Sequence, residues 1–304
     1  IDLCELLFAI DESIVIIPAH VWTPWFGLLG SASGFDSLRE CCSKYADKIY
    51  AVETGLSSDP AMNWRIAEFN SRTVVSFSDA HSPTKLGREL TVLASHKQTP
   101  FTYQQFVEAL RKQGDWHIAY TVEFYPEEGK YHVDGHAKCG IRQLPEQTRK
   151  NGSMCPVCGR ALTLGVLGRV DTLGTQEVTI STKVNEQGLK FYYPDNPNQK
   201  PYVMLVPLQE IIAECLQKGI NTKAVVAAYE TLLAQFGNEF TILTQTSLIE
   251  LEKHMEPKMV EAIRKVRQGD ICVIPGYDGI FGTVKIWGDR QQAPTNLQEQ
   301  MGLF

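Results

Sequence analysis

Long hydrophobic runs, internal repeats, low-complexity tracts and an excess of basic charge are all absent from this sequence of 304 residues. No run approaches the 18 consecutive apolar residues that a transmembrane helix needs, so we expect no membrane-bound form. The net charge is −6, whereas nucleic-acid-binding proteins are usually basic, so the overall charge argues against DNA until its distribution is considered. The chain opens with Ile1 inside a helix-like run to Ile10, and we expect the true N-terminus to be missing.

The eight cysteines lack the spacing of a disulfide framework. Three of them, Cys139, Cys155 and Cys158, are spaced like metal ligands, which suits a reducing cytoplasm. The other five lie in apolar or helical stretches, where we expect small buried side chains: Cys4, Cys41, Cys42, Cys215 and Cys272.

Strand and helix patterns alternate in the first part of the chain, which indicates βα units in a parallel sheet or barrel. After a break at 131–169, rich in Gly, Cys, Arg and Lys, a mixed α/β region follows. Strands are predicted at 14–18, 49–53, 73–77, 116–124, 271–274 and 283–287, the fourth closing the first domain. Helices are predicted at 36–45 (with Asp36 as N-cap), 60–69, 102–112, 208–218, 222–236 and 257–268. A Gly-rich turn at 275–282 joins the last two strands.

Three consecutive predicted strands end in side chains that bind metals or act as bases. His20 follows the first strand, Glu53 ends the second, and Asp79 and His81 follow the third. Because the carboxyl ends of parallel strands form one face, we expect these four residues in one cleft as the catalytic residues. Imidazole and carboxylate suit Zn²⁺ or Mn²⁺, so His20, Asp79 and His81 are the expected metal ligands. Glu53 is the weakest member, because an arginine could pair with it instead.

Ile17-Pro18-Ala19-His20 and Ser78-Asp79-Ala80-His81 resemble the later metal-binding motifs of the polymerase-and-histidinol-phosphatase (PHP) superfamily. The order of motifs is most similar to endonuclease Q, through residues 19–27, 53–60, 78–83 with 87–89, the cysteine segment and 275–279. The resemblance implies a partial distorted (β/α)₇ barrel that hydrolyses phosphoesters with Mg²⁺, Mn²⁺ or Zn²⁺. The superfamily opens with a His-x-His pair, which this sequence lacks, so we expect the opening barrel strands and their ligands to be missing and this chain alone to be inactive.

Cys155-Pro156-Val157-Cys158, followed by Gly159, has the spacing of a zinc knuckle. Cys139 is the expected third ligand and His136 the fourth, because a two-residue gap recurs between them, with His132 as the alternative. A closed four-ligand site cannot hydrolyse a substrate, so the expected Zn²⁺ is structural.

Basic residues are concentrated around this knuckle, where residues 138–169 contain six basic side chains and one acid, a local charge of +5. We expect this segment to contact DNA phosphates. Aromatic residues near the predicted cleft, among them Phe26, are candidates for stacking on bases. The full set of predicted DNA-binding residues is Lys138, Arg142, Arg149, Lys150, Arg160, Arg169, Trp22, Trp25 and Tyr277.

Together these features predict three regions, a barrel part at 1–128, a zinc-binding module at 129–170 and an α/β DNA-binding region at 171–304. The resemblance implies a cytoplasmic DNA repair endonuclease that cuts 5′ to deaminated bases (uracil, hypoxanthine or xanthine), with replication or repair proteins as further partners. The damaged base would be flipped out of the duplex. Two alternatives are a PHP-type phosphatase acting on a small phosphoester and a catalytically dead DNA-binding protein.

Overall fold

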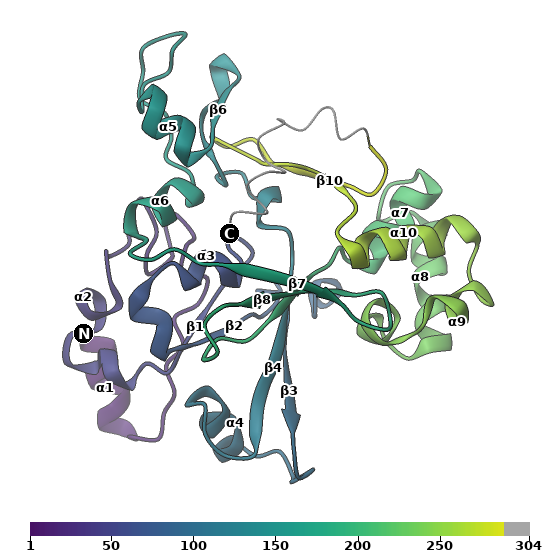
Figure 1. Cartoon of the computed structure of the whole chain (residues 1–304), viewed down its shortest axis with the longest axis horizontal. Helices are drawn as coiled ribbons and strands as arrows, with labels where there is room; N and C mark the ends of the chain where they lie inside the picture. Colours follow the sequence, from purple (N-terminus) through teal and green to yellow (C-terminus); the bar gives the residue numbers. More distant parts are fainter. Residues whose placement is uncertain (289–304) are drawn as a thin grey trace.

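The computed structural model describes residues 1–288 as a mixed α/β fold. In Figure 1 the N-terminal elements lie on the left, a group of helices on the right, and a small module projects at the top. The elements that precede the module are α1 (Asp2–Ile10), α2 (Leu38–Cys42), η1 (Ser43–Lys48), β1 (Ala51–Glu53), α3 (Pro60–Trp64), η2 (Ala67–Ser71), β2 (Thr73–Val75), η3 (Pro83–Lys85), β3 (Leu90–Ser95), α4 (Tyr103–Leu110), β4 (Trp116–Glu123) and η4 (Pro126–Glu128).

The projecting module is built around a short antiparallel hairpin. Its elements are β5 (Asp134–His136), η5 (Ala137–Cys139), β6 (Ile141–Gln143) and α5 (Pro145–Asn151), and α6 (Val166–Leu173) leads back to the body. The elements that follow are β7 (Ile180–Val184), β8 (Lys190–Pro194), β9 (Tyr202–Met204), α7 (Leu208–Leu216), α8 (Lys223–Phe236), the π-helical turn η6 (Thr241–Gln245), α9 (Leu248–Glu252), α10 (Pro257–Gln268), β10 (Cys272–Ile274) and β11 (Thr283–Lys285).

Two sheets organise the body of the molecule. β1 and β2 form a parallel pair in which Glu53 lies opposite Val75. The larger sheet has the order β3-β4-β9-β8-β7, and its one parallel pair, β4 with β9, joins strands from either side of the module. β4 therefore does not close a separate first domain, as the sequence had suggested. One hydrophobic core, with members from Cys4 to Ile286, also includes residues before and after the module.

The elements before the module pack against the elements that follow it, and their apolar faces cover one another. Trp64, at the end of α3, packs edge to face on Tyr202 of β9 with 5.6 Å between ring centroids. Residues 289–304 of the predicted third region lie outside the described residues. Within residues 1–288, none of the helices has the length and apolar character that a bilayer crossing requires.

The helices after residue 200 agree with the sequence pattern, whereas several predictions nearer the N-terminus are wrong, among them the single helix at 36–45, which divides into α2 and η1. Residues 14–18 form no strand, and this segment meets β1 through two hydrogen bonds, Glu53 N to Pro18 O and Val21 N to Glu53 O, both 3.1 Å. Pro18 has no N–H to extend the ladder. The predicted helix at 60–69 divides into α3 and η2.

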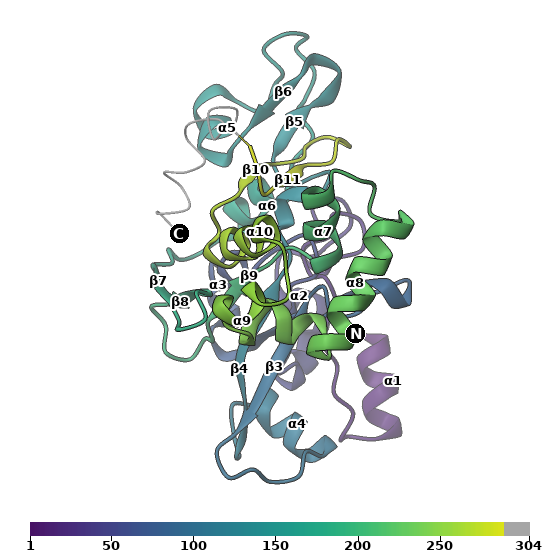
Figure 2. The same cartoon turned by 90° about the vertical axis from the view of Figure 1, so that its right-hand side faces the viewer.

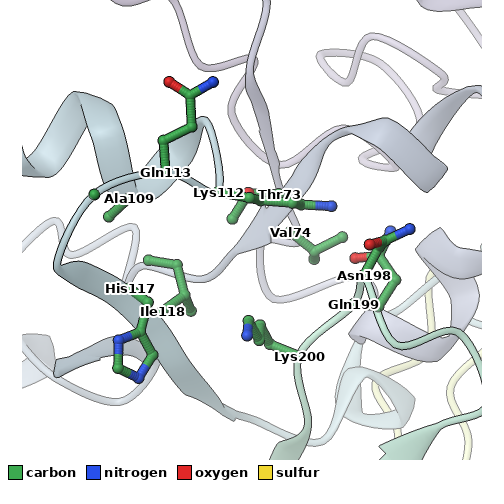
Figure 3. A pocket seen from close by; sticks show the side chains of 11 residues that line it. Thr73, Val74, Ala109, Lys112, Gln113, His117, Ile118, Asn198, Gln199 and Lys200 are labelled. Carbon is green, nitrogen blue, oxygen red and sulfur yellow. The ribbon is translucent and has the colours of Figure 1, made fainter. Parts of the chain in front are cut away.

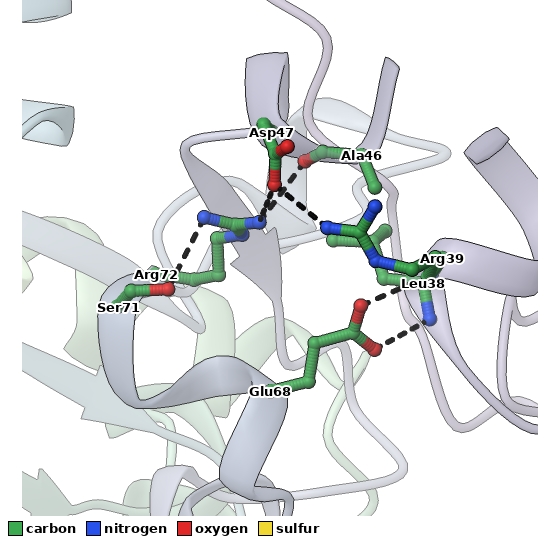
Figure 4. Close-up of polar contacts among 7 residues, drawn as sticks. All are labelled: Leu38, Arg39, Ala46, Asp47, Glu68, Ser71 and Arg72. Carbon is green, nitrogen blue, oxygen red and sulfur yellow. Dashed lines mark hydrogen bonds and ion pairs between the residues drawn. The ribbon is translucent and has the colours of Figure 1, made fainter. Parts of the chain in front are cut away.

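The short elements α2, η1 and η2 are held together by polar side-chain contacts (Figure 4). Ser37, not Asp36, caps α2 by accepting from Glu40 N, because Asp36 pairs instead with Arg169 at 2.7 Å. Figure 4 shows the Glu68 carboxylate accepting from two N–H groups at the start of α2, at 2.8 and 3.0 Å. This contact fixes α2 to the segment that leads into β2.

Candidate metal centres

The carboxyl ends of β1 and β2 lie side by side, because the two strands are parallel and in register. The chain leaves β1 toward Thr54 and β2 toward Ser76, and the Oγ atoms of these two residues are 2.7 Å apart. The segment that contains His20 joins the same edge through its hydrogen bonds to Glu53. The structure therefore brings the ends of all three predicted segments to one edge.

Glu53 connects these three segments. Its carboxylate is 4% exposed and accepts from the backbone N–H of His20 and, at 3.3 Å, of Phe77. Burial raises the pKa of Glu53, the two N–H groups and His20 lower it, and the charge of Asp79 raises it. Glu53 thus pairs with backbone amides, not with the arginine considered in the sequence, and it positions the residues around it.

His20 and Asp79 share a left-handed backbone conformation, with φ of 35° and 45°, which is uncommon for residues other than glycine. Gly55 packs against His20 so closely that a Cβ at residue 55 would lie 2.4 Å from the His20 Cβ. Arg88 donates from Nε to Ser78 O at 2.8 Å and from Nη2 to Asp79 O at 3.3 Å. The loop that carries Asp79 is therefore held by a side chain that the sequence reading did not assign a role.

The two imidazoles at this edge differ in their surroundings. His81 is exposed, and its Nδ1 lies 2.9 Å from Asp79 O, so Nδ1 is the donor and Nε2 keeps its lone pair. His20 Nδ1 is buried and has no hydrogen-bond partner. Within residues 1–288, however, the ligand atoms of His20, Asp79 and His81 do not come together as a compact group of three.

One compact group of metal-binding side chains is present among residues 1–288, and it lies in the projecting module. It consists of His136, Cys139, Cys155 and Cys158, whose ligand atoms all lie within 4.8 Å of one another. Cys158 Sγ is 3.7 Å from His136 Nδ1. His132, the alternative ligand, is not in the group, because it is buried elsewhere, and burial lowers its pKa to about 4.

Two similar turns present these four ligands. Each turn places a glycine directly after its second ligand, Gly140 with φ of 65° and Gly159 with φ of 70°. The Gly159 N–H donates to Cys155 O at 2.8 Å, and Cys155 N–H donates to Arg160 O at 2.7 Å. Side chains other than glycine rarely adopt such φ values, so the glycines permit the reversals that aim the sulfurs inward.

The crowded thiols perturb each other's protonation. Desolvation, followed by contacts with Cys158 and Cys155, raises the pKa of Cys139 to about 11. Desolvation also raises the pKa of Cys155, but the N–H groups of Cys158 and Val157 outweigh it, so the net shift is downward. Three sulfurs and one imidazole at this spacing suit a tetrahedral divalent ion, which would neutralise the thiolates. The group can therefore hold a metal.

The Gly-rich segment at 275–282 docks on this module. Asp278 accepts from Ala137 N at 2.6 Å and from Thr163 Oγ1 at 2.5 Å, each oxygen serving one donor. The Tyr277 ring packs on Gly135, where a Cβ would lie 2.4 Å from the ring. The segment therefore anchors the module and leaves Tyr277 little freedom to stack on a base.

Two further predicted DNA contacts are used inside the protein. Trp22 is 1% exposed, and its indole N–H donates to Asn63 Oδ1 at 3.0 Å, so it is a core residue. Arg169 is mostly buried, donates to Leu29 O and Phe35 O, each at 3.1 Å, and pairs with Asp36. Both side chains have partners inside the protein, and their contact with DNA stays a prediction.

The remaining predicted contacts are accessible to different degrees. Arg149 forms an ion pair with Asp171 and a second with Glu146 at 3.8 Å. Trp25 is 48% exposed and packs edge to face on Tyr131 at 4.8 Å, and Phe26 is 82% exposed. No ion pair within residues 1–288 involves Lys138, Arg142, Lys150 or Arg160.

Two buried carboxylates behind the edge were missed by the sequence reading. Glu123 is fully buried at the end of β4, where it accepts from Ser76 Oγ at 2.6 Å and from Thr121 Oγ1. Glu89 is 1% exposed and accepts from Phe124 N at 3.1 Å. Glu89 belongs to the motif at 87–89, but the sequence pattern did not assign it a role. No sequence signal marks Glu123, because an isolated Glu is normally a surface residue.

Known proteins resemble this chain in sequence. Residues 207–270 match the family described as the MJ0043 C-terminal domain. The chain is 33% identical over 281 residues to the uncharacterized protein MJ0043 of Methanocaldococcus jannaschii, covering 90% of this chain and 33% of the relative. It is 30% identical over 277 residues to the uncharacterized protein YqxK of Bacillus subtilis, covering 90% of this chain and 62% of the relative. The chain thus spans about a third of the length of MJ0043 and about three fifths of the length of YqxK.

Two crystal structures share the fold. One is the lesion-specific endonuclease PfuEndoQ of Pyrococcus furiosus, with a TM-score of 0.75 and 29% identity, covering 98% of this chain and 68% of that chain. The other is endonuclease Q in complex with a 27-mer duplex carrying an abasic lesion at the active site, with a TM-score of 0.73 and 29% identity. This match covers 97% of this chain and 68% of that chain. The chain is therefore similar in fold, along almost its whole length, to lesion-specific nucleases of the endonuclease Q type.

Proposed function

We propose that this chain is part of a metal-dependent DNA repair endonuclease that cuts the phosphodiester 5′ to a deaminated base. The observation that carries the proposal is the match along 98% of the chain to a lesion-specific endonuclease. Uracil, hypoxanthine and xanthine are the proposed lesions, and DNA that contains them is the proposed partner. Replication or repair proteins are proposed as further partners.

The proposed catalytic site is the edge at which the carboxyl ends of β1 and β2 meet the segment that contains His20. His20, Asp79 and His81 are the proposed ligands of Mg²⁺, Mn²⁺ or Zn²⁺, and β1 with β2 is the proposed part of a PHP-type barrel. The orphaned, buried Nδ1 of His20 and the His81 tautomer with a free Nε2 support this assignment. Bound metals supply activation of the attacking water and stabilisation of the leaving oxygen. Glu53 and Arg88 act as positioning residues, because they hold the backbone on which His20 and Asp79 stand.

The four-ligand group in the module is the proposed structural Zn²⁺ site, and the module is the proposed surface for DNA phosphates. Its exposed basic residues, Lys138, Lys150 and Arg160, and half-buried Arg142 lie on a part of the molecule that projects from the body (Figure 2). Trp25 and Phe26 are the proposed base contacts, because their rings are exposed and follow His20 closely in the chain.

A cleavage assay tests the catalytic part of the proposal. The full-length protein that carries this chain and its Asp79→Ala variant are incubated with labelled duplexes that contain uracil, hypoxanthine or an abasic site, with each of the three metals. We expect cleavage by the parent and a loss of at least a hundredfold in the variant. Asp47→Ala is a matched control, because Asp47 is an exposed carboxylate on η1. Absent cleavage by the parent, or equal cleavage by both, refutes the nuclease mechanism.

A DNA-binding protein without cleavage activity is the second candidate. The observation that favours it is that, within the described part of the chain, only the module forms a compact metal-binding group. Gel-shift measurements on the same duplexes separate the two, because this candidate predicts binding of the DNA without any cut strand.

A further inference from the structure

A small pocket lies at the amino end of β2, whereas the proposed catalytic edge lies at the carboxyl end of the same strand. It is a cavity of about 100 Å³ between the start of β2, the start of β4, the segment after α4 and the segment before β9. Thr73, the first residue of β2, lines it, whereas Asp79 follows the other end of that strand. The volume is several times what one water molecule needs, so the pocket has room for a small ion.

Two lysines from distant segments line this pocket. Figure 3 shows the side chains of Lys112, from the segment after α4, and Lys200, from the segment before β9, among the residues that line the pocket. Among residues 1–288, neither lysine forms an ion pair with a carboxylate. The printed contact of Lys112 Nζ is a 3.3 Å hydrogen bond to Asn70 O. Each ammonium therefore retains donors that a ligand can use.

The electrostatic environment of Lys112 is unfavourable for its charge. Desolvation, together with the nearby charges of Lys200 and Arg72, lowers the pKa of Lys112 to about 8. Arg72 does not line the pocket, and Figure 4 shows its guanidinium donating to Ala46 O at 3.1 Å and paired with Asp47 at 3.7 Å. Within residues 1–288, the two charges here without a carboxylate partner are therefore those of Lys112 and Lys200. Half-buried positive charges that repel each other are normally compensated by an anion.

The other polar groups around the cavity are compatible with an anion. Asn198 is exposed at the rim, and the His117 ring stacks on His96 with 4.3 Å between centroids. The carboxylate of Glu108 lies beside Gly114 at the edge, where Gln104 donates to it at 3.0 Å, but Glu108 does not line the cavity. The lining thus contains cations and amides and no carboxylate.

We propose that this pocket binds a tetrahedral oxyanion, either free phosphate or the terminal phosphate of a larger ester, between Lys112 and Lys200. The site is separate from the metal centres and does not depend on the proposed nuclease activity. The cavity is too small for a nucleotide, so a larger ester would insert its phosphate group alone.

Calorimetric titration of the zinc-loaded protein at constant ionic strength tests this proposal. Its arms are inorganic phosphate, a 5′-phosphorylated trinucleotide and the same trinucleotide without the phosphate. The variants are Lys112→Met and Lys200→Met, and Lys223→Met is the control, because Lys223 is exposed at the start of α8. Thermal melts confirm that each variant is folded.

We expect the parent and the control to bind phosphate, and each pocket variant to bind it at least tenfold more weakly. If only the phosphorylated trinucleotide shows this dependence on Lys112 and Lys200, the ligand is an esterified phosphate. No binding by the parent in either phosphate arm, or equal affinity in parent and pocket variants, overturns the proposal.

Discussion

At the scale of the residue, the left-handed conformations of His20 and Asp79 are a shared feature of the proposed catalytic edge. Each such backbone costs on the order of 1–3 kcal/mol and persists only where surrounding contacts impose it. Glu53, Gly55 and Arg88 supply those contacts. Strain of this kind is frequent at functional sites, so the conformation is compatible with His20 and Asp79 as ligands, but it does not single them out. Five other non-glycine residues within 1–288 also have positive φ: Ser43, Gln98, Lys112, Gln217 and Asp278.

Glu123 is a fully buried carboxylate whose protonation is changed by the fold. Desolvation raises its pKa to about 8, although hydrogen bonds from Ser76 and Thr121 lower it. The unfolded value is about 4.3. The folded state therefore holds the proton more tightly, and the contribution of Glu123 to stability falls as the pH rises from about 4.3 to about 8.

Replacing Glu123 with glutamine should remove this pH dependence. Gln keeps an oxygen that can accept from Ser76 and Thr121 and carries no charge. We expect Glu123→Gln to be more stable than the parent at pH 8 and nearly equal to it at pH 5, measured as urea unfolding midpoints. Glu186→Gln, at an exposed turn, is the control. A stability difference that does not change with pH would show that Glu123 does not titrate in this range.

At the scale of the element, the projecting module cannot depend on a hydrophobic core. Between residues 137 and 165 the buried apolar side chains are Leu144 and Cys155, with the ring of Pro145. The Asp134 carboxylate adds local order by accepting hydrogen bonds from Gly165 N and Thr148 Oγ1, both 2.7 Å. Segments with so little buried apolar surface commonly fold by binding a metal.

Cys155→Ser should therefore lower the zinc content by about one ion per chain. Elemental analysis measures the metal, and limited proteolysis measures whether the segment around α5 becomes accessible. Cys41→Ser is the control, because Cys41 is outside the four-ligand group. Unchanged zinc content in Cys155→Ser would contradict the structural zinc site.

At the scale of the whole molecule, charge is distributed unevenly. Residues 138–169 carry six basic side chains and one acid in a chain of net charge −6. The module that holds five of these basic side chains projects from the body in both views (Figures 1 and 2), whereas Arg169 lies on α6 and contacts the body. An acidic body with one basic projection directs a polyanion to that projection.

The salt dependence of DNA binding should report these contacts. Each phosphate contact adds about −0.9 to the slope of log K against log salt for duplex DNA. We expect Lys138→Gln combined with Lys150→Gln to reduce the slope by about two, and Lys223→Gln to leave it unchanged. Fluorescence anisotropy at several salt concentrations measures both slopes. An unchanged slope in the double variant would place the phosphate contacts elsewhere.

Local patterns predicted much of the fold and one of the two centres. Helix periodicity located α7, α8 and α10, and ligand spacing located the group of His136, Cys139, Cys155 and Cys158. Both signals depend on residues close together in the chain. Trp22, by contrast, follows His20 in an apparently exposed loop, and only its hydrogen bond to Asn63, 41 residues away, shows that it is a core residue.

By itself the sequence determined the class of side chains available, the order of the motifs and the short-range geometry of the module. Tertiary structure alone decided that Glu53 holds three segments together, that Glu89 and Glu123 are buried, and that Lys112 and Lys200 face one cavity. Burial and long-range pairing depend on which distant segments pack together, and no local spacing encodes that choice. For His20, Glu53, Asp79 and His81, the sequence predicted the motifs. Their backbone conformations and hydrogen-bond partners became known only from the tertiary structure.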